Sequence, residues 1–160
     1  MPQFAIQPAR TPADLDAARV LFQAYASSLD IDLAYQGFTD ELATLPGKYA
    51  PPAGDILLAR DPDGKSVGCV AVRPLDPDIC EMKRLYVTPA GRGTGLGRTL
   101  ANAIIATATN LGYREIRLDT LSTMHAALTL YRGLGFVPIA PYYATPISDT
   151  VFLGLQLQPE

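Results

Sequence analysis

Residues 90–99, AGRGTGLGRT, place four glycines and two arginines between an apolar run and a helical pattern. Leu85, Tyr86 and Val87 form the run, and apolar residues at helical spacing follow the glycines. The first N–H groups of a helix have no acceptor within it and carry positive partial charge. Because glycine lets the backbone approach an anion closely, the segment predicts a phosphate-binding loop.

The spacing of these glycines excludes two well-known nucleotide motifs. No glycine triplet between Gly91 and Gly97 fits GxGxxG, and no lysine follows, as a GxxxxGK[ST] loop requires. A glycine-rich connector without chemistry is the alternative. Arg92 and Arg98 favour phosphate binding, because guanidinium groups donate charge-assisted hydrogen bonds to phosphate oxygens.

The rest of the sequence predicts one mixed α/β domain over residues 1–160. Turn residues separate three strands before the glycines, which favours antiparallel pairing there, whereas strands and helices alternate afterwards. Strands are expected at 4–6, 55–60, 66–73, 79–87, 115–119, 136–138 and 151–157. Helices are expected from Thr11 onward, over 38–45, over 96–111 and over 123–134.

Composition narrows the class of protein. The chain has 160 residues and a net charge of −3, which argues against a nucleic-acid partner. No apolar run approaches the length of a membrane span, and the N-terminus does not resemble a secretory signal, so we expect a soluble, cytoplasmic protein without a membrane partner. Cys69 and Cys80 form no CxxC pair, and His125 is distant in sequence, so no metal site is expected.

Two stretches resemble the GNAT superfamily of N-acetyltransferases. CEMKRLYVTPAGRGTGLGRTL, residues 80–100, is similar to that family's fourth strand and pyrophosphate loop, and Arg92, Gly95 and Gly97 satisfy its [R/Q]xxGx[G/A] pattern. LDTLSTMHAALTLYRGLGF, residues 118–136, is similar to its fifth strand and following helix. The match runs from about residue 55 to 136 and is looser before it. The resemblance implies a GNAT-like acyl-CoA N-acyltransferase fold, with a central mixed sheet of about seven strands flanked by helices.

The resemblance also implies that acetyl-CoA binds, as co-substrate, between the fourth and fifth strands. The backbone of Leu85 and Val87 would pair with the pantetheine arm, and the loop would hold the pyrophosphate. His125 stands where many members carry an asparagine that contacts CoA, although a surface histidine is the other interpretation. The implied cofactor-binding residues are Leu85, Tyr86, Val87, Arg92, Gly93, Thr94, Gly95, Leu96, Gly97, Arg98 and His125.

A bulge usually opens the fourth strand in this family. Strict alternation from Cys80 would place Glu81 and Lys83 on the same face as Leu85 and Val87. That arrangement puts charged and apolar side chains together unless a bulge resets the faces.

The implied chemistry is direct attack of a primary amine, from a small molecule or peptide, on the thioester of acetyl-CoA. Tyr131 matches the tyrosine of the family's LYxxxGF helix and is the candidate acid. A phenol with a pKa of about 10 can donate a proton to a departing thiolate with a pKa of about 8.5. The alternative is an ordinary aromatic packed against Ala127 and Leu134.

Glu81 is the candidate general base, acting directly or through water, because its strand should line the cleft. A structural glutamate paired with Lys83 or Arg84 is an equal alternative. The alternative function is a non-catalytic acyl-CoA sensor, which would keep the phosphate-binding loop but would not transfer the acyl group. The presence of Tyr131 and Glu81 favours the enzyme.

The acceptor pocket is expected from residues that are mostly aromatic. Asp119, at a strand end, is expected to orient the substrate or to serve a helix start. The other candidate walls are neutral, so they favour neither cationic acceptors such as polyamines nor acceptors with a carboxylate such as amino acids. These walls are Phe22, Tyr25, the loop 35–37, Tyr142 and Tyr143. Members of the family often form dimers, and the sequence leaves a homodimer open.

Overall fold

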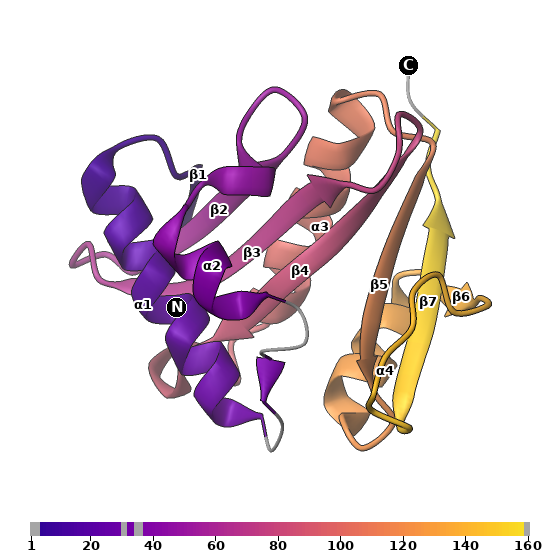
Figure 1. The fold of residues 1–160 in the computed structure, drawn as a ribbon. Helices are drawn as coiled ribbons and strands as arrows, with labels where there is room; N and C mark the ends of the chain where they lie inside the picture. The colour runs from indigo at the N-terminus through magenta and orange to yellow at the C-terminus, as the bar shows by residue number, and fades with distance from the viewer. Residues whose placement is uncertain (1–3, 30–31, 34–36, 159–160) are drawn as a thin grey trace.

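A seven-stranded mixed sheet forms the centre of the protein (Figure 1). The computed structural model describes residues 4–29, 32–33 and 37–158, and within them β4–β5 is the one parallel pair. The strand order is β1-β2-β3-β4-β5-β7-β6, which confirms the predicted mixed sheet. The strands are β1 (Ala5–Pro8), β2 (Asp55–Arg60), β3 (Ser66–Pro74), β4 (Ile79–Val87), β5 (Glu115–Leu121), β6 (Val137–Pro138) and β7 (Thr150–Gln156).

Helices cover both faces of the sheet, as Figure 1 shows. α1 and α2 lie on one face, and α3 and α4 lie on the other. None of the helices in the described ranges is long and apolar enough to cross a membrane. The helices are α1 (Pro12–Ser28), α2 (Phe38–Ala43), α3 (Leu96–Asn110) and α4 (His125–Gly133), with short 3₁₀ turns η2 (Gly47–Tyr49) and η3 (Pro89–Gly91).

The start of α1 is fixed by a capping box. The Thr11 hydroxyl accepts a hydrogen bond from the Asp14 amide at 3.1 Å, and the Asp14 carboxylate accepts one from the Thr11 amide at 3.1 Å. Asp14 also binds Arg60 on β2 at 2.8 Å. The predicted helix start is confirmed, and the same carboxylate ties α1 to the sheet.

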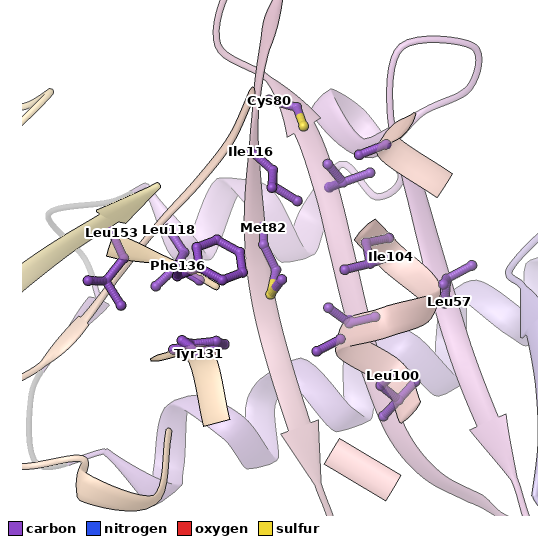
Figure 2. Packing of buried hydrophobic residues seen from close by; sticks show 14 of the residues in the cluster. Leu57, Cys80, Met82, Leu100, Ile104, Ile116, Leu118, Tyr131, Phe136 and Leu153 are labelled. Atoms are coloured by element: carbon purple, nitrogen blue, oxygen red, sulfur yellow. The ribbon is translucent and has the colours of Figure 1, made fainter. Parts of the chain in front are cut away.

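The larger apolar core lies between the sheet and the pair α3 and α4. Leu100 and Ile104 of α3 are buried there with Met82 of β4, as Figure 2 shows. Gly68 of β3 allows the close approach of α3, because a Cβ at this position would lie 2.8 Å from the Leu100 side chain. α3 therefore packs closely against β3 and β4.

Candidate active site between β4 and β5

The sheet splits between its two parallel strands. β4 and β5 pair only over three positions, from Ile79 opposite Glu115 to Glu81 opposite Arg117. Beyond this point the strands diverge, and the gap is visible in Figure 1. A cleft of about 100 Å³ lies here, lined by residues of α1, β4, β5 and α4. Backbone groups that diverging strands leave unpaired are available to an extended ligand.

A bulge on β4 confirms the break in alternation that the sequence predicted. Ala71 of β3 is opposite Lys83, and Cys69 is opposite Tyr86, so one residue of β3 faces two of β4. Arg84 has a φ of 62°, a conformation that residues other than glycine rarely adopt. Leu85 therefore packs on the α3 side, whereas Lys83 stays on the other face.

Arg84 is held in this conformation by a buried ion pair. Its Nε and Nη2 atoms each donate to the Glu41 carboxylate of α2 at 2.9 Å. The guanidinium also lies over the rings of Phe38 and Tyr25. The bidentate carboxylate and the two rings compensate the charge of the guanidinium, and they fix the backbone of Arg84 beside the cleft.

The glycine loop joins β4 to the start of α3, as the sequence predicted. Gly93 and Gly95 have φ values of 77° and 80°, which only glycine adopts without strain. The first-turn amides of a helix have no acceptor within it. In α3 no side-chain cap accepts from them either. The Leu96 side chain is buried, which leaves its backbone as the part that can bind a ligand.

Side chains of the loop shape its edges. Arg92 donates from Nε to the Val87 carbonyl at 3.2 Å, and Thr94 donates from Oγ1 to the Gly91 carbonyl at 2.6 Å. Arg98 contacts α4, because a Cβ on Gly133 would lie 2.9 Å from its Nη2 atom. The amino end of α3 thus abuts the helix that carries Tyr131.

Tyr131 lines the cleft from α4, as predicted. Its side chain packs edge-on against Phe136, with ring centroids 5.7 Å apart, and lies beside Leu118 and Phe136 in Figure 2. Burial raises the pKa of the hydroxyl above its usual value, and the nearby Tyr25 and Asp119 raise it further. The hydroxyl is therefore protonated at neutral pH and able to donate.

Glu81 is not on the cleft wall, and its expected partners are wrong. Its side chain is only 1% exposed, and Arg73, rather than Lys83 or Arg84, pairs with it at 2.8 Å. The Tyr142 hydroxyl donates to its other oxygen at 2.5 Å. A carboxylate closed in by these two donors has no open path to an amine.

Tyr142 and Tyr143 brace the split rather than line it. Tyr142 donates to Glu81 of β4, and Tyr143 donates to Asp119 of β5. The two rings also meet Phe152 of β7 edge-on, with centroids 5.2 Å from it in both cases. One loop therefore fastens both strands at the point where they part.

The remaining predicted residues divide into those at the cleft and those away from it. Tyr25 and Asp119 line the cleft. The placement of Phe22 as a pocket wall is wrong, because its side chain is fully buried against Tyr49 beneath α1. His125 starts α4 with an exposed side chain and does not line the cleft.

Three consecutive residues of β4 that were predicted to contact the cofactor lie in different places. Leu85 lines the cleft, Tyr86 turns toward Tyr25 on the α1 face, and Val87 packs on the α3 side. Residues 35 and 36 of the predicted loop lie outside the described ranges.

Two cations that were not predicted as site residues form part of the cleft wall. Lys83 and Arg84 line the cleft and are 7% and 3% exposed. Burial lowers the pKa of Lys83, while Glu81 acts to raise it. Their signal in the sequence is two consecutive charges in a strand that, apart from Glu81, is otherwise without charge. The wall residues named from the sequence are neutral apart from Asp119, and they do not include these two cations.

Comparison with known proteins identifies the family. Residues 21–136 match the Acetyltransferase (GNAT) family, so the chain belongs to it. An uncharacterized N-acetyltransferase of Schizosaccharomyces pombe is 44% identical over 154 residues, which cover 96% of this chain and 94% of that protein. The resemblance predicted from the two motifs is confirmed.

Solved structures share the fold over almost the whole chain. A Klebsiella pneumoniae protein assigned as an acyl-CoA N-acyltransferase superposes with a TM-score of 0.73 at 30% identity, covering 98% of this chain and 99% of that one. A Salmonella typhimurium protein assigned as an acetyltransferase, solved with its cofactor acetyl-CoA, has a TM-score of 0.70 at 23% identity, covering 98% and 95% of the two chains.

Proposed function

We propose that the protein transfers the acetyl group of acetyl-CoA to a primary amine of a small molecule or peptide by direct attack. One observation carries the proposal: the uncapped end of α3 abuts the helix that places Tyr131 in the split of the sheet. A Cβ on Gly97 would lie 4.0 Å from Leu130, the residue before Tyr131. A diphosphate held at α3 would thus direct the attached thioester toward Tyr131.

The loop supplies a cradle for the diphosphate. Amides of the first turn of α3 donate to phosphate oxygens, the helix end contributes positive partial charge, and Arg92 or Arg98 adds charge. The open edge of β4 after Glu81 pairs with the amide groups of the pantetheine arm. This places the thioester carbonyl beside the bulge, where a backbone N–H stabilises the oxyanion.

Proton transfers fall to two groups on the cleft wall. An aliphatic amine with a pKa of about 10 is mostly charged at neutral pH and must lose a proton before it attacks. Among the described residues, Asp119 is the carboxylate that lines the cleft, so it replaces Glu81 as the proposed acceptor of this proton, directly or through water. When the C–S bond breaks, the Tyr131 hydroxyl donates its proton to the CoA thiolate.

The relatives support acetyl transfer over mere binding. The Schizosaccharomyces pombe relative bears the name of an N-acetyltransferase, and the Salmonella typhimurium protein holds acetyl-CoA in the same fold. The position of the Tyr131 hydroxyl at the cleft also favours turnover over an acyl-CoA sensor.

The test has two stages. Calorimetric titration with CoA is expected to give saturable binding, and its absence with folded protein would contradict the proposal. Acetyl-CoA is then incubated with a panel of amines, and released thiol is measured with a chromogenic thiol reagent. Release that depends on the amine supports the enzyme, whereas CoA binding without release for any amine supports the sensor.

A further inference from the structure

Six charged side chains gather where β4 and β5 separate. Four of them form two ion pairs, with N–O distances of 2.8 and 2.9 Å, that bind β4 to β3 and to α2. Two more, one of each sign, line the cleft from β4 and β5, and the carboxylate of these two accepts a hydrogen bond from Tyr143. The pairs are Arg73 with Glu81 and Arg84 with Glu41, and the other two residues are Lys83 and Asp119.

We infer that the acceptor carries a carboxylate as well as its amine, as amino acids do, with Asp119 at the amino end and Lys83 at the carboxylate end. This inference rests on the proposed acetyl transfer and names the class of acceptor for the same cleft. One cation and one anion on opposite strands are complementary to a ligand that carries both charges.

The burial of Lys83 favours an anionic ligand. Its side chain is 7% exposed, and the loss of water lowers the pKa of its ammonium group. A carboxylate brought next to it stabilises the charged form and replaces part of the lost hydration. Glu81 and Asp119 already act in this direction, but Arg84 and Arg73 oppose them.

The same charges disfavour acceptors that carry several ammonium groups. A polyamine in the cleft would place its second cation near Lys83, whose charge repels it. Leu29 and Leu33, which follow α1, add apolar side chains to the wall, so the part of the acceptor beyond the charges is apolar.

Matched amines test this inference in the wild-type protein. Three amines share the leucine side chain and differ at one position. Leucine carries a carboxylate there, leucinamide a neutral amide and 3-methylbutylamine a hydrogen atom. Thiol release is measured over a range of pH, and kcat/KM is expressed per concentration of unprotonated amine. We expect kcat/KM for leucine to exceed that for the other two by at least about tenfold, since charge-assisted hydrogen bonds are the strong ones. Equal or better use of 3-methylbutylamine would overturn the inference.

A substitution assigns the preference to one residue. Lys83→Met should bring the ratio of kcat/KM for leucine and 3-methylbutylamine to about one, and Lys65→Met, in an exposed turn, should leave the ratio unchanged. Calorimetric CoA binding checks that each variant is folded. A ratio that Lys83→Met leaves as in the wild type would contradict the inference.

An equilibrium measurement remains decisive if Lys83→Met does not fold. Leucine should raise the melting temperature of the wild-type complex with CoA, and 3-methylbutylamine at the same concentration should not. A rise with 3-methylbutylamine alone would overturn the inference. If CoA binds but no amine releases thiol, the proposed transfer itself fails, whereas release that favours amines without a carboxylate contradicts the acceptor class only.

Discussion

The Tyr142 hydroxyl lies 2.5 Å from the Glu81 carboxylate, although the two residues are 61 positions apart in the sequence. The contact closes a buried carboxylate that Arg73 holds from the other side. It joins the loop after β6 to Glu81, the last residue of β4 that pairs with β5.

Tyr142→Phe should therefore weaken the fold. The change removes one donor to a carboxylate that is 1% exposed, and hydrogen bonds to charged groups contribute about 1.5–3 kcal/mol. Chemical denaturation should show an unfolding free energy lower by about that amount. Tyr143→Phe, whose partner Asp119 is only half-buried, serves as the control and should cost less. Equal stability of Tyr142→Phe and the wild type would contradict the role of this contact.

Glu41→Gln should be one of the most destabilising single changes. It leaves Arg84, whose side chain is 2% exposed, without its charged bidentate partner. Breaking a buried pair from one side costs about 3–5 kcal/mol. Asp16→Asn is the matched control, because Asp16 is exposed in its pair with Arg19 and should cost less than about 1 kcal/mol. Similar melting temperatures for the two variants would show that the buried pair contributes little.

Gly95→Ala should impair CoA binding beyond its effect on stability. Its φ is 80°, and a Cβ there meets no atom within 4 Å, so the cost is backbone strain of about 1–2 kcal/mol. Gly64→Ala imposes the same strain at φ 84° in a distant hairpin turn. Both should lower the melting temperature, but calorimetry should detect weaker CoA binding only for Gly95→Ala. Equal CoA affinity in the two variants would remove residue 95 from the phosphate loop.

Tyr131→Phe should lower kcat far more than CoA affinity. The hydroxyl that donates to the leaving thiolate is lost, and general acid catalysis contributes about 10²–10⁴-fold. Tyr113→Phe is the control, because Tyr113 is also buried and its hydroxyl binds the Ala53 carbonyl at 2.6 Å, away from the cleft. Unchanged turnover by Tyr131→Phe would rule out the proposed acid.

Asp14→Asn should remove a part of the stability that depends on pH. Hydrogen bonds from the Arg10 and Thr11 amides and from Arg60 hold the pKa of Asp14 well below its usual value of 3.8. A carboxylate with a depressed pKa contributes stability above its unfolded pKa, and this contribution is lost as pH falls through the folded pKa. Denaturation at pH 7 should show a cost of about 1 kcal/mol for the variant. The difference from the wild type should shrink below pH 4, and a constant difference down to pH 2 would contradict this origin.

The fold was predictable because local signals agree with it. Thr11 and Asp14 mark the start of α1, and the left-handed Gly93 and Gly95 mark the passage from β4 to α3. These features depend on neighbours in the sequence. The mixed sheet then follows from the order of strands and helices.

The details of the site were less predictable, because they depend on contacts between distant segments. No local pattern shows that Tyr142 closes over Glu81, so Glu81 looked like an open base. The α1 pattern places Phe22 on the apolar face but does not say whether that face meets a cleft or the core. The position of the bulge at Arg84 depends on Glu41, which lies 43 residues earlier.

The bulge at Arg84 also places neighbouring parts of β4 on opposite faces of the sheet. Lys83 belongs to the layer under α1 and α2, while Leu85, two positions later, belongs to the layer under α3. In the proposed function the side chains before the bulge face the acceptor, so we expect that varying them changes the acceptor selectivity and leaves CoA binding after the bulge intact. We therefore expect relatives of this chain to differ in their acceptors while they bind the same acetyl donor.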